Sequence, residues 1–415
     1  MLRRECERGS ADMRILFLHS NFPAQFGPFA QYLWKQGWEV WFGTQNERAA
    51  LDGVNIFIHT PHRDVSPNVH PYLSDFERAV IAGQSVARAG LRLADKGLKP
   101  DIVVAHSGWG QGLFARDIWP DAKYIGYFEW YYSRDAPDLA AEGASDRTFD
   151  GHAQSRVRNA PILIDLAGCD AGICPTGFQK AQFPECFQEK LHVIHDGIDT
   201  ATFRPAPSNG LSLDGLEIPA SREIITYVAR GMEPYRGFPQ FMKSLETILA
   251  RRPNAHAVIV GEDRVAYGSK LPPGDSYKKR ALAALDLDAS RIHFTGLLSR
   301  SDYRKVLEAS DVHVYLTAPF VLSWSLMEAM SAGCAIVASD VEPVRELAPD
   351  GEAAMIRVDM NQPREISDAI GYLLDNRAVG QTLASAARQI ILDRYSTERL
   401  FPRKMNWLET VSRRD

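Results

Sequence analysis

The chain has 415 residues, of which 45% are hydrophobic and 24% are charged, and this composition is typical of soluble globular proteins. Its formal net charge of -5 argues against a general nucleic-acid binder, whose binding face would be basic. No apolar run approaches the roughly 18 residues that a membrane-spanning helix needs. The length exceeds that of one common domain and predicts two.

The N-terminal residues and the cysteines narrow the cellular setting. Residues 1–12 are polar, carry no hydrophobic signal core and are expected to form a disordered extension. Five cysteines with no CxxC pair suit a reducing cytoplasm better than a disulfide framework. Cys169 and Cys174 have no second ligand pair nearby, so we expect no metal site. The region Arg88–Lys99 is basic and periodic, which fits peripheral membrane contact or, more commonly, a solvated helix face.

Apolar, β-branched runs alternate with longer helical patterns along the first half of the chain. The predicted strands are 14–19, 39–43, 101–106, 123–127, 171–174 and 191–195, with a helix at Phe29–Gln36 after the first. Runs that are apolar on both faces and separated by helices indicate a mostly parallel sheet covered on both sides. Residues 13–205 are therefore expected to form a Rossmann-like N-terminal domain.

The same pattern restarts after Phe203–Gly210, a stretch rich in Pro and Gly that predicts a linker. The second set of predicted strands is 223–229, 255–261, 292–295, 312–316, 335–339 and 354–357. We expect residues 206–395 to form a second doubly wound domain, and residues 396–415 a helix that can pack back on the first. Two such domains would face each other across a cleft at the carboxyl ends of their sheets, where ligands collect.

Three features follow strands of the first domain. Gly27 ends the loop after the first strand, and this loop is not the GxGxxG fingerprint of dinucleotide binding. His106 ends a strand before a glycine-containing loop, where a role facing the cleft and a structural role both fit. Glu129 lies in the aromatic stretch Tyr127–Arg134. That stretch can line an acceptor pocket, because sugars stack on rings, or belong to the packed core.

The first loop of the second domain carries two arginines, Arg230 and Arg236. Guanidinium groups suit phosphate because they offer two parallel charged hydrogen bonds in a fixed geometry. We therefore predict that these arginines bind phosphate, with solvated surface arginines as the alternative. The next strand runs into Gly261, in a turn over which a base or ribose can lie.

The segment Pro319–Asp340 predicts a loop, a helix, a tight turn and a strand. Ser323 or Ser325 is expected to cap the helix, and Gly333 to end it. Glu328 falls within its first turns. Free backbone N–H groups beside a carboxylate can hold a phosphate at one end and a sugar hydroxyl at the other. The simpler alternative is an ordinary crossover helix with one solvated glutamate.

Taken in order, these motifs resemble the retaining glycosyltransferases of family 4, which have the GT-B fold. The resemblance is carried by His195–Thr200 with Phe203–Pro205, Tyr227–Gly237, Val258–Gly261, Ile292–Gly296 with Leu307–Asp311, and Ser325–Ser339. It implies a UDP-sugar or GDP-sugar donor held mainly by the C-terminal domain. It also implies a glycan, lipid-linked or small-molecule acceptor on the N-terminal domain, no metal or other cofactor, and a place in polysaccharide or glycoconjugate synthesis.

The resemblance also assigns roles to residues. Arg230 and Arg236 match the basic pair that holds the donor diphosphate. Glu328 matches the carboxylate on the donor ribose, and His106 matches the histidine near the donor sugar. Gly261 and Ser325 fall in the matching donor-binding segments, and Gly27 and Glu129 fall on the acceptor side. The family commonly has a second glutamate that contacts the transferred sugar, and Phe320 occupies its position. Sequences with this Pro-Phe-Val-Leu-Ser-Trp-Ser pattern resemble a separate branch of the family.

In the implied reaction, negative charge grows on the leaving diphosphate, where the two arginines and the helix N-terminus would stabilise it. A covalent double displacement needs two nearby carboxylates, and the sequence offers no such pair. A front-face reaction, in which the acceptor attacks from the side of the leaving group, fits better. A nucleotide-sugar epimerase of the same fold and a non-catalytic nucleotide-sugar sensor remain the rival hypotheses.

Overall fold

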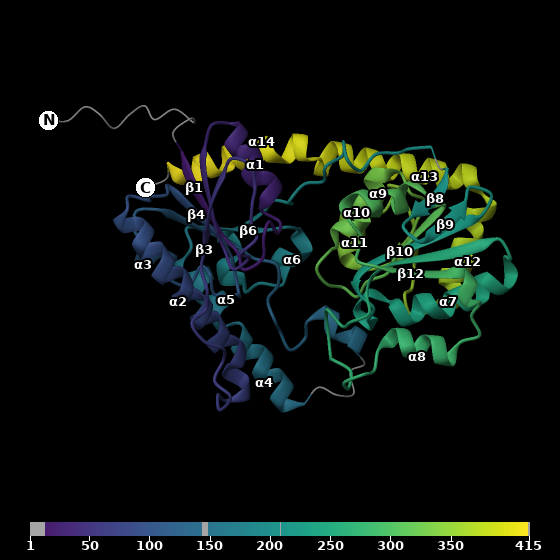
Figure 1. The fold of residues 1–415 in the computed structure, drawn as a ribbon, viewed down its shortest axis with the longest axis horizontal. Helices are drawn as coiled ribbons and strands as arrows, with labels where there is room; N and C mark the ends of the chain where they lie inside the picture. Colours follow the sequence, from purple (N-terminus) through teal and green to yellow (C-terminus); the bar gives the residue numbers. More distant parts are fainter. Residues whose placement is uncertain (1–12, 143–147, 208, 414–415) are drawn as a thin grey trace. The chain divides into compact units, whose positions relative to one another are not determined.

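The computed structural model describes residues 13–142, 148–207 and 209–413, and residues 1–12 with their expected disorder lie outside these ranges. Its contacts divide the chain into two units (Figure 1). Unit 1 comprises the described residues of Met1–Ala136, Arg147–Asp196 and Glu398–Asp415, and unit 2 those of Pro137–Asp146 and Gly197–Thr397.

Unit 1 is built on a seven-stranded parallel sheet with the order β3-β2-β1-β4-β5-β6-β7. The strands are β1 Arg14–Leu18, β2 Glu39–Thr44, β3 Val54–Ile58, β4 Ile102–His106, β5 Lys123–Tyr127, β6 Ala171–Cys174 and β7 Leu191–Val193. The central strands are buried along nearly their whole length, because helices cover both faces of a parallel sheet. This places the carboxyl ends of all seven strands at one edge.

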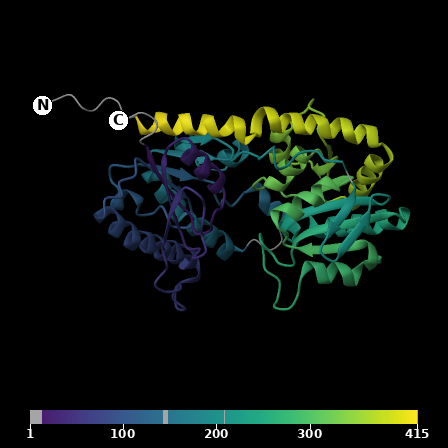
Figure 2. The same cartoon turned by 45° about the horizontal axis from the view of Figure 1, so that its top comes forward.

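Helices of unit 1 lie on both faces of this sheet. They are α1 Gly27–Lys35, α2 Ser74–Asp95, α3 Ala115–Ile118, α4 Phe149–Arg158, α5 Ala160–Gly168 and α6 Gly177–Ala181, with short η2 Pro71–Leu73 and η5 Glu185–Lys190. The C-terminal helix α14, Thr397–Ser412, packs on α1 (Figure 2). The rings of Phe29 and Phe401 are 5.3 Å apart in this contact.

Unit 2 repeats the architecture with a six-stranded parallel sheet in the order β12-β11-β10-β13-β14-β15. Its strands are β10 Glu223–Gly231, β11 Ala255–Glu262, β12 Ile292–Gly296, β13 Val312–Tyr315, β14 Ile336–Ser339 and β15 Ile356–Val358. An antiparallel hairpin, β8 Gly210–Leu213 and β9 Leu216–Pro219, precedes the first strand. The strands predicted from the sequence do not include this hairpin.

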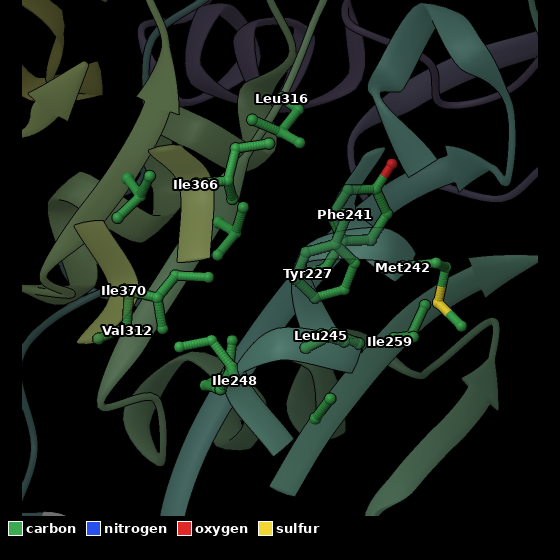
Figure 3. Packing of buried hydrophobic residues seen from close by; sticks show 14 of the residues in the cluster. Tyr227, Phe241, Met242, Leu245, Ile248, Ile259, Val312, Leu316, Ile366 and Ile370 are labelled. Carbon is green, nitrogen blue, oxygen red and sulfur yellow. The ribbon is translucent and has the colours of Figure 1, made fainter. Parts of the chain in front are cut away.

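The helical segments of unit 2 are η3 Pro137–Glu142, η6 Pro234–Arg236, α7 Phe238–Arg251, α8 Tyr277–Ala284, η7 Ala289–Arg291, α9 Arg300–Glu308, α10 Trp324–Ala332, α11 Glu342–Leu347, α12 Pro363–Asp375, α13 Arg377–Ile390 and the π-helical η8 Ile391–Tyr395. Helices α7 and α12 bury their apolar faces on the sheet. Figure 3 shows this core, in which Tyr227 of β10 and Phe241 of α7 stack with ring centroids 4.7 Å apart. This packing fixes the position of the β10–α7 connection.

The prediction of two doubly wound, parallel-sheet domains is confirmed. The contact units differ from the expected ranges at three places. The continuous part of unit 1 ends at Asp196 rather than at Pro205. The described part of Pro137–Asp146 belongs to unit 2, and the chain returns to unit 1 at Glu398. The chain enters unit 2 at Gly197 and leaves it after Thr397. An isolated parallel β-bridge between Ile198 and Ser396 joins these two segments within unit 2.

Candidate functional site

Helix α10 begins at the carboxyl edge of the unit 2 sheet, after β13. Ser323 is its N-cap, and its Oγ accepts a hydrogen bond from the backbone N–H of Ser325. The side chain of Ser325 is buried and lies 3.0 Å from the Ser323 hydroxyl. Gly333 ends the helix in the left-handed conformation, with φ of 81°. Of the two predicted capping residues, Ser323 is therefore the cap, and Ser325 lies in the first turn.

Glu328 is not the solvated side chain of the simpler alternative. It is half-buried, and its Oε2 accepts a hydrogen bond of 2.9 Å from the hydroxyl of Tyr303 on α9. Burial raises the pKa of Glu328 from its ordinary value, while Tyr303 and the nearby Arg300 oppose that rise and Asp199 adds to it. Glu328 is the fifth of the nine residues of α10, beyond the first turn of the helix. A carboxylate held in one orientation can accept hydrogen bonds from ligand hydroxyl groups.

Arg236 is buried and holds a neighbouring loop in place. Its guanidinium donates to the Thr317 hydroxyl at 2.7 Å and to the Val321 carbonyl at 3.1 Å. Both partners lie between β13 and α10. Arg236 therefore orders the loop that leads to the cap of α10, and two of its donors are already used within the protein.

Arg230 differs from Arg236 in every one of these respects. It is exposed near the end of β10, beside a bulge that shifts the strand register between Val228 and Gly231. Its guanidinium makes no hydrogen bond or ion pair with another side chain or backbone group in the described ranges. The two predicted arginines lie on the same β10–α7 connection, and Arg230 is the one whose donors stay available to a ligand.

An aromatic cluster surrounds Phe320. Its ring packs edge-on against Tyr235 and Tyr267, with centroids 5.5 and 5.2 Å away, and the Arg236 guanidinium lies 5.2 Å from the Tyr267 ring. The Tyr235 hydroxyl donates to Oδ2 of Asp138 at 2.9 Å. The position at which the resemblance places a second glutamate is thus enclosed by rings. Asp138 and Tyr267 carried no signal in the sequence that links them to this cluster.

Glu233 is a further residue that the sequence analysis did not single out. It is fully buried and accepts a hydrogen bond from the backbone N–H of Ala266. Burial raises the pKa of Glu233, and the backbone N–H groups of Ala266 and Tyr267 oppose that rise. Glu233 therefore ties the loop after β11 to η6, and this contact positions Tyr267.

Gly261 meets a steric requirement of the sheet. Its φ is 140°, and a Cβ at this position would lie 2.0 Å from the Ala229 carbonyl oxygen. Only glycine allows β10 and β11 to approach this closely. The expected contact of Gly261 with a donor remains a prediction.

In unit 1 the structure brings together His106 and Glu129, two of the predicted site residues. Nε2 of His106 lies 3.3 Å from Oε2 of Glu129, and its Nδ1 lies 3.0 Å from the Ser107 carbonyl. The imidazole is buried, with the ring of His19 at 4.9 Å. Because β1 and β4 are neighbours in a parallel sheet, both histidines stand at its carboxyl edge.

A buried carboxylate forms hydrogen bonds with β5 and with the loop after β4. Asp165 of α5 accepts hydrogen bonds of 2.7 Å from the hydroxyl groups of Ser107 and Tyr124. Burial raises the pKa of Asp165 to about 6, although the hydrogen bonds from Ser107 and Tyr124 oppose the rise. The sequence analysis missed Asp165, for which a single acid inside an apolar helix was the only signal.

Gly27 and the His-Asp-Gly motif have structural roles in unit 1. A Cβ on Gly27 would lie 2.4 Å from Cβ of Pro23, so the tight turn into α1 excludes larger residues. Asp196 accepts a hydrogen bond of 2.8 Å from the Tyr127 hydroxyl, and Nζ of the buried Lys404 lies 3.9 Å away. The acceptor-side role of Gly27 remains a prediction.

Among residues 13–142, 148–207 and 209–413, no group of three or more His, Cys, Asp or Glu side chains is placed to hold a metal ion. Cys169 and Cys174 are buried free thiols, and burial raises their pKa to about 11 and 12. In the same ranges no helix combines the length and the apolar character that crossing a membrane requires.

Two family models match successive parts of the chain. Residues 36–203 match the glycosyl transferase family 4 group, and residues 222–376 match the glycosyl transferases group 1. The first match falls mainly in unit 1, and the second lies within unit 2 and includes Arg230, Arg236 and Glu328.

Curated relatives share modest sequence identity. A phosphatidyl-myo-inositol mannosyltransferase of Mycolicibacterium smegmatis is 29% identical over 223 residues, which are 53% of this chain and 52% of the relative. A D-inositol 3-phosphate glycosyltransferase of Nocardioides sp. is 22% identical over 381 residues, 85% of this chain and 80% of the relative. The chain thus spans about half the length of the mannosyltransferases that it matches.

Solved structures share the fold. Sucrose-phosphate synthase of Thermosynechococcus elongatus has a TM-score of 0.72 at 15% identity, covering 96% of this chain and 99% of that one. HepE of Anabaena, solved in complex with UDP-glucose, has a TM-score of 0.68 at 16% identity, covering 96% and 100%. With two Rossmann-like parallel-sheet domains that each match a glycosyltransferase family model, the chain is a glycosyltransferase of the GT-B fold, and its residues 36–203 are similar to the family 4 group.

Proposed function

We propose that this protein is a retaining glycosyltransferase that moves a hexosyl group from a nucleotide-sugar donor to an acceptor hydroxyl. The observation that carries the proposal is the setting of Glu328. Its carboxylate is half-buried and oriented by Tyr303, on a capped helix that begins at the carboxyl edge of a parallel sheet. That setting suits the two hydroxyl groups of a donor ribose.

The donor diphosphate would bind between Arg230 and the first turn of α10. Arg230 is exposed with unused donors, and the helix start at Ser323–Ser325 adds the positive end of the helix dipole. Arg236 would act mainly by holding the 316–323 loop, since its guanidinium is already bonded to Thr317 and Val321. This division refines the sequence-based hypothesis, which gave both arginines the same role.

As the bond between sugar and phosphate breaks, negative charge would accumulate on the diphosphate. Arg230 and the backbone N–H groups of α10 would stabilise that charge more than the charge of the intact donor. In unit 2, the aromatic surroundings of Phe320 provide no carboxylate at the position where the family has one. A front-face reaction, in which the departing diphosphate accepts the proton of the acceptor, needs none.

The acceptor would bind to unit 1 beside His106 and Glu129. Their contact at 3.3 Å gives a donor and an acceptor of hydrogen bonds at one sheet edge. The names of two groups of relatives refer to inositol, as phosphatidyl-myo-inositol and as D-inositol 3-phosphate. Inositol-bearing acceptors are therefore the first to test. The corresponding setting is the synthesis of a glycoconjugate or polysaccharide in the cytoplasm. The protein would work there either in contact with the membrane through Arg88–Lys99 or away from it.

A thermal-shift screen over UDP-sugars and GDP-sugars tests the donor, because a ligand that binds the folded state raises the melting temperature. Mass spectrometry of the best donor, with and without inositol-bearing acceptors, then tests the reaction. Nucleotide release that depends on the acceptor supports the transferase. A changed sugar without acceptor would instead show an epimerase, and binding without turnover would show a sensor.

A further inference from the structure

A hollow in unit 1 lies away from the proposed reaction. It has a volume of about 580 Å³ and is formed by the C-terminal end of α1, the turn that follows, and the first residues of β2 and β3. These are the amino ends of the strands, whereas His106 stands at a carboxyl end. The length of strand between the two edges is about 13 Å. The hollow is large enough for a small ligand.

Trp34 provides a flat and rigid wall. Its side chain is 42% exposed, and a Cβ on Gly53 would lie 2.0 Å from the indole ring, so the Gly53 backbone packs directly on one ring face. The left-handed φ of 76° at Gly53 and its lack of a side chain make this contact feasible. The Gly53 contact restricts the orientation of the indole, and 42% of the surface of Trp34 stays open to solvent.

Hydrogen-bonding groups stand around this ring. Glu39 contributes a carboxylate, whose charge the Arg14 guanidinium balances across 2.7 Å, and Asn55 contributes an amide that is bonded to the Val40 carbonyl at 3.3 Å. Oε1 of Glu39 also accepts a hydrogen bond of 2.7 Å from Nε1 of Trp41, and each carboxylate oxygen retains a further lone pair. Because the charges are paired locally, the hollow suits a neutral ligand rather than a phosphate.

An exposed ring flanked by a carboxylate and an amide matches the chemistry of a sugar, which offers a C–H face for the ring and hydroxyl groups for the polar side chains. Trp34 is the one exposed large hydrophobic residue among those that line the hollow. A protein partner would require a wider apolar patch. We propose that this hollow is a second saccharide site, which binds a hexopyranose ring of a glycan apart from the reaction at the other edge of the sheet.

The test is a titration of the full chain with methyl α-D-mannopyranoside and with maltotriose, observed by saturation-transfer difference NMR. We expect millimolar binding, which Trp34→Leu weakens about fivefold or more, because leucine keeps apolar volume without a ring face. Trp34→Phe should retain most of the affinity, and Asn55→Ala should reduce it. Circular dichroism and the melting temperature of each variant show whether the fold is kept.

Trp109→Leu is the matched control, since Trp109 is also exposed in unit 1 but stands beside His106. It should leave binding unchanged. The proposal would be overturned if neither saccharide bound the wild-type protein. It would also be overturned if Trp34→Leu and wild type bound with equal affinity, or if Trp109→Leu alone lost saccharide binding. The donor-induced thermal shift should be the same in Trp34→Leu and wild type, so a failure of the proposed glycosyl transfer is distinguishable from a failure of this second site.

Discussion

The hydroxyl of Tyr303 donates to Oε2 of Glu328 across 2.9 Å and so joins helices α9 and α10. Tyr303 is partly buried, and burial, followed by the Glu328 charge, raises its pKa well above 10.0. The phenol therefore stays protonated and remains a hydrogen-bond donor at every physiological pH. This contact fixes the orientation in which Glu328 could meet a ligand.

Replacing this donor tests whether orientation matters. We expect Tyr303→Phe to lower the free energy of unfolding by about 1 kcal/mol, because the buried carboxylate loses a hydrogen bond. The thermal shift induced by the best nucleotide sugar should also shrink. Tyr372→Phe, on the exposed surface of α12, is the control and should alter neither quantity. A full donor-induced shift in Tyr303→Phe would show that Glu328 needs no such orientation.

The two arginines of the β10–α7 connection should separate binding from stability. Arg230 is exposed with no described partner, so Arg230→Ala should leave the free energy of unfolding within about 0.5 kcal/mol of wild type and reduce the donor-induced thermal shift. Arg236→Ala should cost about 2–4 kcal/mol, because the buried Thr317 hydroxyl and the Val321 carbonyl lose their partner. Urea denaturation measures the free energy of unfolding of both variants.

Arg364→Ala, which removes a strongly exposed arginine of α12, is the control for surface charge. It should change neither stability nor the donor-induced shift. Equal destabilisation by Arg230→Ala and Arg236→Ala would contradict the division of roles between the two residues.

Much of the fold was accessible from the sequence because parallel strands buried on both faces leave long apolar runs. The runs at Arg14–His19 and Glu223–Ala229 predict the first strand of each unit, and each lies within a residue or two of the observed end. The order of strands in a doubly wound sheet follows from the same alternation. The hairpin at Gly210–Pro219 was missed although the sequence carries its signal, since Leu211, Leu213 and Ile218 alternate with polar residues on either side of an Asp-Gly turn.

The site was less accessible, because side-chain partners far apart in the chain have no local pattern. The role of Glu328 could be suggested from a helix start, but its partner Tyr303 lies on another helix. Asp165 supports the loop after His106 from a distance of more than fifty residues in sequence. The burial of Arg236 likewise could not be predicted, because the local sequence of a buried loop arginine does not differ from that of a solvated one.

Asp165 should give the stability of unit 1 a pH dependence that can be isolated. Its pKa of about 6 lies above the ordinary value of 3.8. The folded state therefore holds the proton more tightly, and this contribution to stability is complete below pH 3.8 and is lost as the pH rises through 6. A shift of about two pKa units corresponds to about 3 kcal/mol.

Asp165→Asn removes this titration while its amide oxygen still accepts a hydrogen bond. The free energy of unfolding of the variant, relative to wild type, should rise between about pH 4 and pH 6.5 and then become constant. Urea denaturation at a series of pH values measures the difference. Parallel curves for the two proteins over this range would show that Asp165 titrates normally in the folded state.

Phe320→Glu would restore the residue that the family commonly has, and we expect it to impair the protein. The Phe320 ring is buried between Tyr235 and Tyr267, so a carboxylate there would lose hydration without gaining a described hydrogen-bond donor. A loss of about 2–5 kcal/mol in the free energy of unfolding at pH 7 is expected. The loss should decrease at pH 5, because a buried carboxyl protonates more readily.

Phe320→Leu is the control for volume and should cost about 1–2 kcal/mol at either pH. Donor turnover, measured as nucleotide release, should not increase in Phe320→Glu. A variant of wild-type stability with faster turnover would show that the aromatic cluster leaves room for the family's second carboxylate.

Lys404 offers the strictest test of how α14 is held on unit 1. Its buried ammonium lies 3.9 Å from Oδ1 of Asp196 and 4.9 Å from the centre of the Phe29 ring. Burial lowers the pKa of Lys404, and the Asp196 charge opposes that fall. Lys404→Met would leave Asp196 as a buried charge with the Tyr127 hydroxyl as its described hydrogen-bond partner.

We expect Lys404→Met to lower the free energy of unfolding by about 3–5 kcal/mol, because removing one member of a buried ion pair strands the other. The double variant Lys404→Met/Asp196→Asn should recover most of this loss, since a neutral amide tolerates burial and can still accept from Tyr127. Lys35→Met, at the exposed end of α1, is the matched control and should be close to neutral. Urea denaturation of wild type, Lys404→Met, Asp196→Asn and the double variant gives the coupling energy. Additive losses in the double variant would mean that the two charges do not interact, and that apolar contacts such as Phe29 with Phe401 hold the helix.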